Sequence, residues 1–243
     1  MVGYNQLPQT PPMAPITAKL LPESQRSEYA LRRAVAALGY QETINFSFVD
    51  ARWEHELAGN ADPIKLLNPI ASQMSVMRSS LLGSLLQVQK FNQDRKASRV
   101  RVFEIGRVFL RNASIGSTDT TVQGFDQPMR LAGLAVGACD ATDWGRKDRA
   151  VDFYDVKGDI ETLLAPLQPS FAAAAGHPAL HPGRCAQILL DGTPIGFVGE
   201  LHPKWRQSYE LVQAPIVFDR SGRRAEPARA GVQDRLEVPG GRA

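Results

Sequence analysis

The stretch that decides the fold is NPIASQMSVMRSSLLGSLLQVQKFNQDR at residues 68–95, followed by VRVFEIGRVFL at residues 100–110. Its first part enters a helix that Ser79 or Ser80 can cap. Apolar side chains then follow at helical spacing: Leu82, Leu85, Leu86 and Phe91. The second part is dense in β-branched and aromatic residues, which predicts a long strand with a bulge at Gly106.

Upstream of this stretch, the sequence predicts a helix capped by Ser24 and ended by Gly39. A half-buried strand is expected next, because three apolar residues alternate with polar ones: Ile44, Phe46 and Phe48. A short helix is expected after Asp50, followed by a brief strand at residues 64–67.

Downstream, the predicted elements include two strands, two helices and a hairpin. They are a strand at 129–138, a helix starting near Phe153, a hairpin of 186–190 and 195–201, a short helix from Pro203 and a strand at 216–218. Hairpins separated by helices, without strict β-α-β alternation, predict an α+β domain with an antiparallel sheet flanked by helices.

Composition places the 243 residues in the globular class and excludes collagen-like and disulfide-scaffold proteins. The net charge is +3, but residues 219–243 hold six arginines against four acidic residues, so the rest of the chain is nearly neutral. Residues 1–22 contain five prolines and residues 219–243 have no apolar periodicity, so we expect a linker at 1–22, one module at 23–218 and a disordered tail at 219–243. Two cysteines, no apolar run long enough for a bilayer and no secretory signal at the start favour the cytoplasm and no membrane contact.

No catalytic signature or metal site is predicted from the residues. His177 and His181 have a spacing that could place two imidazoles on one helix face, but Pro178 and Pro182 break any helix there. An aspartate-rich run at 140–159 is interrupted by lysines and arginines, which is typical of a solvated surface.

Several segments together resemble the C-terminal half of the β subunit of bacterial phenylalanine–tRNA ligase. Besides the opening stretch they are VGYNQLP at 2–8, LGYQETINFSFVD at 38–50, DFYDVKGDIETLL at 152–164, HPGRCAQILLDGTPIGFVGELHP at 181–203 and APIVF at 214–218. Their order and spacing cover residues 2–218. The resemblance implies a degenerate core of the class II aminoacyl-tRNA synthetases that has lost catalysis.

The residues that an active class II core uses to hold ATP are altered here. In the strand that resembles the second class II motif (Arg101, Phe103, Glu104 and Arg107), the expected Arg-x-Glu is broken. Val102 stands two residues before Glu104, and Arg101, three residues before, should point to the opposite face of the strand. In the stretch resembling the third motif, Arg206 is displaced beyond Pro203. We therefore expect no catalytic residue, metal or cofactor on this chain, while ATP and Mg²⁺ are implied for the parent complex.

What the resemblance implies instead is assembly with the α subunit, in a heterotetramer of two α and two β subunits that reaches tRNA(Phe) as a complex. Residues 68–95 resemble the first class II motif, which forms subunit interfaces, and Arg78 would bridge to the partner. The expected interface residues are Asn68, Pro69, Met74, Met77, Arg78, Leu82, Leu85 and Leu86. Two alternatives stay open: a free-standing class II-like amino-acid ligase, and an RNA-binding module that uses the arginine-rich tail.

Overall fold

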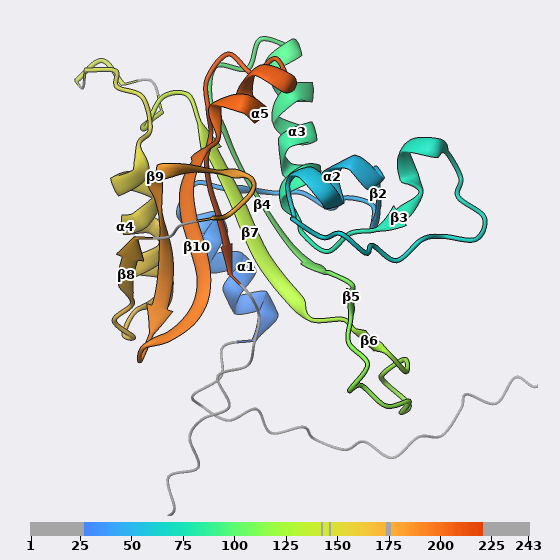
Figure 1. Cartoon of the computed structure of the whole chain (residues 1–243). Helices are drawn as coiled ribbons and strands as arrows, with labels where there is room; N and C mark the ends of the chain where they lie inside the picture. The colour runs from blue at the N-terminus through green and yellow to red at the C-terminus, as the bar shows by residue number, and fades with distance from the viewer. Residues whose placement is uncertain (1–26, 142, 146, 174–175, 221–243) are drawn as a thin grey trace, which may run out of the picture.

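A seven-stranded sheet organises the chain, in the order β1-β4-β7-β11-β10-β9-β8 (Figure 1). The computed structural model describes residues 27–141, 143–145, 147–173 and 176–220. The sheet strands are β1 (Gln41–Glu42), β4 (Val100–Arg107), β7 (Met129–Val136), β8 (Ser170–Ala173), β9 (Leu180–Leu190), β10 (Thr193–Leu201) and β11 (Ile216–Arg220). All neighbours in it are antiparallel except β1 and β4, which are parallel, so the predicted α+β class is confirmed with a mixed sheet.

Five α-helices and one short 3₁₀ helix accompany the sheet in the described part of the chain. They are α1 (Glu28–Ala37), α2 (Ala51–Glu56), η2 (Ser72–Met74), α3 (Leu82–Asp94), α4 (Phe153–Leu164) and α5 (Pro203–Ser208). Two small two-stranded sheets complete the fold: β2 (Phe48–Val49) with β3 (Val76–Met77), and β5 (Leu110–Arg111) with β6 (Phe125–Asp126). The last pair continues β4 and β7 into an arm that projects from the sheet (Figure 1).

Each face of the sheet packs against the chain's own helices, so the domain has two hydrophobic cores. Helices α1 and α4 cover one face, where Val35 and Ile160 meet strand residues such as Phe103. Helices α3 and α5 cover the other face, where Leu85 and Trp205 pack on strand residues including Val102. The alternation along β4 therefore sends successive side chains into different cores.

Local signals explain where most elements begin and turn. Asp152 and Asp155 form a capping box at the start of α4. His202 caps α5 through its Nδ1, which accepts the backbone N–H of Lys204 at 3.0 Å. The β9–β10 hairpin turns at Asp191 and Gly192, which both have positive φ, as a tight two-residue turn requires. These helices and this hairpin are confirmed predictions.

The predicted strand at 44–48 is wrong in both extent and orientation. Only Phe48–Val49 is a strand, and it pairs with β3 rather than with the main sheet. Ile44 and Phe46, expected to be half-buried, are 90% and 67% exposed. The reason is that hydrogen bonds hold the polar residues on either side of Ile44, Thr43 and Asn45, against β4, which leaves the apolar side chains facing outward.

Other differences concern single positions. Gly106 is no bulge, because β4 and β7 keep continuous register there, and Phe91 on α3 is 54% exposed. The segment at 64–67 forms one bridge, from Lys65 to Val76, instead of a strand. Strand β8, of the sequence SFAA, had no signal strong enough to predict it.

The predicted ends of the module need one correction. Strand β11 runs to Arg220, so Asp219 and Arg220 belong to the sheet and not to the tail. The remaining tail at 221–243, the linker at 1–22 and the Ser24 cap lie outside the described residues; α1 is capped by Ser27.

Candidate functional site

The predicted interface residues divide into two groups in the structure. Asn68 and Pro69 are exposed, and Met74 and Met77 are partly buried. The other four lie inside the chain's own fold with at most 3% of their surface exposed: Arg78, Leu82, Leu85 and Leu86. The structure contradicts the prediction for these four, because the three leucines of α3 pack in the core between this helix and the sheet, and Arg78 is buried against Glu104.

Arg78 does not bridge outward; it forms a buried ion pair within the chain. Its Nη1 lies 2.7 Å from Oε1 of Glu104, and each side chain is only 3% exposed. The Nε of Arg78 donates to the carbonyl oxygen of Arg107 at 3.0 Å, while Asn45 donates to the second oxygen of Glu104 at 2.7 Å. Both charges are therefore neutralised and hydrogen-bonded without a partner chain.

Gly106 makes room for this pair. A Cβ at residue 106 would overlap the guanidinium of Arg78 and lie 3.0 Å from Oε1 of Glu104. Glu104 and Gly106 share one face of β4, which is the face that packs against α3. The sequence signal was present, a glycine inside a strand, but it marks a close approach of side chains rather than a bulge.

Arg101 lies on the opposite face of β4 from Glu104. Its Nη1 is 3.0 Å from Oδ2 of Asp159 on α4, and the same oxygen accepts the hydroxyl of Tyr40 at 2.9 Å. Burial, followed by the charge of Asp159, raises the pKa of Tyr40, so its hydroxyl stays a donor. Arg101 is thus also committed to an internal network.

The other two residues of the predicted second-motif strand have different surroundings. Phe103 is fully buried between β4 and the α1–α4 layer. Arg107 is exposed at the end of β4, where its Nη1 donates to the carbonyl oxygen of Gln127 at 2.8 Å.

A buried acidic side chain on β11, not predicted from the sequence, faces a partly exposed arginine on β7. Asp219 is 1% exposed, and its Oδ2 lies 3.7 Å from Nη1 of Arg130. Burial raises the pKa of Asp219 from 3.8 to about 6, although Arg130 opposes the shift. An acidic residue within the apolar strand IVFDR was the available signal.

The stretch that resembles the third motif carries structural contacts. Arg206 donates to the carbonyl oxygens of Leu211 and Val212 and so holds the turn after α5. The ring of His177 packs at a tilt of 47° against Phe197 with centroids 4.0 Å apart, and burial lowers the pKa of His177 to about 4.

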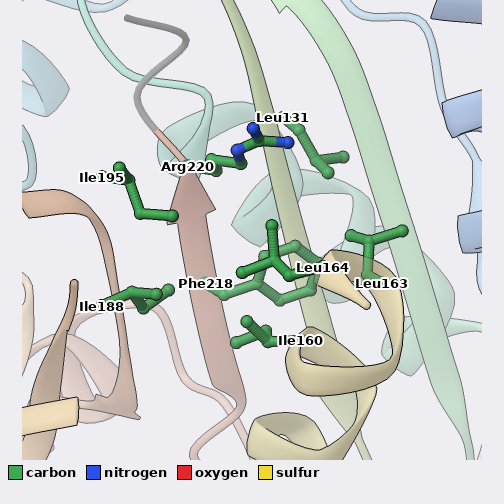
Figure 2. Close-up of a pocket in the computed structure, with 8 residues that line it drawn as sticks. All are labelled: Leu131, Ile160, Leu163, Leu164, Ile188, Ile195, Phe218 and Arg220. Atoms are coloured by element: carbon green, nitrogen blue, oxygen red, sulfur yellow. The ribbon is translucent and has the colours of Figure 1, made fainter. Parts of the chain in front are cut away.

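The space between α4 and the sheet is filled by apolar side chains. Figure 2 shows Ile160 and Leu164 of α4 facing Phe218 of β11, with Arg220 at the upper edge. The cavity that remains there measures about 10 Å³, enough for one water molecule at most. This part of the sheet therefore has no room for a nucleotide.

The described residues contain neither a cluster of metal-ligating side chains nor a membrane-spanning helix. No group of three or more histidine, cysteine or acidic side chains has the arrangement of a metal site in the described ranges. None of the helices in those ranges has the length and hydropathy needed to cross a bilayer.

The fold is similar to that of an aminoacyl-tRNA synthetase of known structure. It matches a solved pyrrolysyl-tRNA synthetase, Desulfitobacterium hafniense PylSc, with a TM-score of 0.57, over 80% of this chain and 62% of that one. Sequence identity between the two is 11%, so this similarity concerns the fold alone. It agrees with the class II-like fold expected from the sequence.

A family model places the chain more specifically. Residues 7–220 match the model described as the phenylalanyl tRNA synthetase beta chain CLM domain, and the chain belongs to this family. Its relatives include phenylalanine–tRNA ligase beta subunits of Ralstonia nicotianae (52% identical), Burkholderia pseudomallei (51%) and Bordetella bronchiseptica (49%). Each match covers 89% of this chain, and the chain spans about 27% of each relative's length.

Proposed function

We propose that the chain is a non-catalytic, synthetase-like module of a phenylalanine–tRNA ligase β subunit that supports the catalytic α subunit. The parent complex, of two α and two β subunits, would charge tRNA(Phe) with phenylalanine in the cytoplasm, using ATP and Mg²⁺. Family membership over residues 7–220 supports the assignment to the β subunit.

The non-catalytic role is supported by the ion pairs that the charged residues of β4 form within the chain. Phosphate-binding arginines must be free to neutralise an anion in the transition state. Here Arg101 is held by Asp159, and Glu104 is held by the buried Arg78. These residues do not fit a nucleotide, so no step of adenylate formation is assigned to them.

The same arrangement is compatible with binding and supporting a partner protein. Both faces of the sheet are covered by the chain's own helices, so the hydrophobic cores are formed by this chain alone. The surface that remains for a partner near the predicted interface includes Asn68 and Pro69, and two large apolar side chains, Leu67 and Ile70, are 97% and 80% exposed beside them. Exposed apolar residues of this size are typical of a protein–protein contact.

Two measurements test the proposal. The full chain should co-elute with a co-expressed α subunit, for example that of the Ralstonia nicotianae enzyme, in size-exclusion chromatography at micromolar concentration. The purified chain alone should give no ATP–pyrophosphate exchange with any amino acid. Robust exchange would instead favour the ligase alternative, and failure to co-elute would contradict the supporting role.

A further inference from the structure

The turn that leads into β9 depends on the ring of His177. The carbonyl oxygen of His177 accepts the backbone N–H of Leu180 at 3.2 Å, with Pro178 and Ala179 between them. The Nδ1 of His177 accepts the backbone N–H of Ala179, also at 3.2 Å. An imidazole can accept at Nδ1 only when it is neutral, because both ring nitrogens of the charged form are donors. The turn therefore requires an unprotonated His177.

This turn joins the start of β9 to α5. The carbonyl oxygen of Ala179 accepts the backbone N–H of His202 at 2.9 Å, and that of Pro178 accepts the indole N–H of Trp205 at 2.8 Å. Ala179 and Trp205 are both buried in the core on the α3 side of the sheet. Because the two accepting carbonyl groups belong to the turn that His177 holds, a change in the turn is passed directly to α5.

Burial, rather than a neighbouring charge, lowers the pKa of His177 to about 4. Its ring packs against Phe197 of β10, and residues 57–60, which approach Pro178 at Gly59, include no charged residue. The charged residues of β9, β10 and α5 have other partners: Arg184 pairs with Glu200, Lys204 lies over the ring of Trp205, and Arg206 donates to the carbonyl oxygens of Leu211 and Val212. The remaining titratable residues of β9 and of the start of α5 are His181, Cys185 and His202.

We propose that the His177 turn is an acid-sensitive latch: protonation of its imidazole releases the start of β9 and α5 from the domain, while the rest of the sheet stays paired. The proton binds at Nδ1, so the hydrogen bond from Ala179 is lost and a charge is left in a partly buried site. In the open turn an imidazole titrates near the ordinary pKa of about 6.5. The contribution of the neutral ring to the closed form is therefore complete above about pH 6.5, and it is lost as the pH falls from there toward about 4.

The test follows hydrogen exchange by NMR in the full chain at pH 7 and pH 5, corrected for the intrinsic exchange rates. The reporters are the indole N–H of Trp205 and the backbone amides of Leu180 and His202, which all donate to the turn. A pKa near 6.5 in the open form and about 4 in the closed form should increase the opening about 20-fold between the two pH values. At pH 5 the reporters should also exchange faster than the amides of β4, because the opening is local.

Two variants separate the charge of the ring from the shape of the turn. In His177→Asn the side chain can still accept the N–H two residues on, but it does not titrate. The control His181→Asn makes the same substitution in a similar but exposed turn, where the ring of His181 accepts from Gly183 at 3.1 Å. The pH effect on the reporters should fall below about 3-fold in His177→Asn and stay near 20-fold in His181→Asn.

Three results would overturn the latch. They are an unmodified chain whose reporters show no pH effect, reporters that exchange only together with the amides of β4, and a His177→Asn variant that keeps the full pH effect. Should His177→Asn fold poorly, His177→Ser repeats the comparison, because a serine hydroxyl makes the same local hydrogen bond without titrating.

Discussion

The buried pair of Arg78 and Glu104 gives the sharpest prediction about stability. Replacing Arg78 with methionine removes the cation and leaves a carboxylate that is 3% exposed with one hydrogen bond, from Asn45. An uncompensated buried charge costs about 3–5 kcal/mol, a large part of the roughly 5–15 kcal/mol that stabilises a typical domain. The free energy of unfolding of Arg78→Met should fall by that amount, measured by urea denaturation followed by circular dichroism.

Two further variants make the reasoning refutable. Adding Glu104→Gln to Arg78→Met removes the stranded charge but keeps an acceptor for Asn45, so the double variant should recover about 2 kcal/mol or more. Arg184→Met breaks an exposed pair with Glu200 in which the arginine side chain is 61% exposed, and it should cost less than about 1 kcal/mol. If Arg78→Met costs no more than Arg184→Met, or if the double variant recovers nothing, the energetic account of the pair is wrong.

Three other predictions follow from single contacts. Burial raises the pKa of Asp219 from 3.8 to about 6, so the stability that its protonated form contributes is present below about pH 4 and is lost as the pH rises through about 6. Asp219→Asn should therefore be more stable than the unmodified chain by up to ~3 kcal/mol near pH 7.5. Urea titrations at both pH values should show that this difference vanishes near pH 4. Gly106→Ala should lower the unfolding free energy by about 1–3 kcal/mol through overlap with the buried guanidinium, and an unchanged melting temperature would contradict the close packing. His202→Ala should cost about 1 kcal/mol by removing the α5 cap, and His202→Asp should restore most of it in the same thermal assay.

The sequence predicted elements whose signals are local. The turn at Asp191 and Gly192, the apolar spacing of the helix from Phe153 and the proline that opens α5 all act within a few residues. Each of them was therefore visible without knowledge of the rest of the fold. Strand β8 was missed because Ser-Phe-Ala-Ala has little alternation, and its place beside β9 depends on the whole sheet.

The candidate site was harder to predict, because distant contacts decide it. Arg78 pairs with Glu104, which lies 26 residues further along the chain, and no local sequence pattern near either residue predicts this pair. Similarly, Ile44 and Phe46 face outward because Asn45, which lies between them, points inward and hydrogen-bonds to Glu104 of β4. A period-2 pattern predicts two faces, but only the fold shows which one meets the core.

The position of β11 in the sheet has a consequence for how the domain is made. This strand comes last in the described chain, yet it lies between β7 and β10 and hydrogen-bonds to both. Until it is in place, β1, β4 and β7 share no ladder with β10, β9 and β8. During synthesis the two halves of the sheet therefore stay unjoined, with apolar surface uncovered, until residues 216–220 emerge and pair with both. A chaperone would be most useful at this stage.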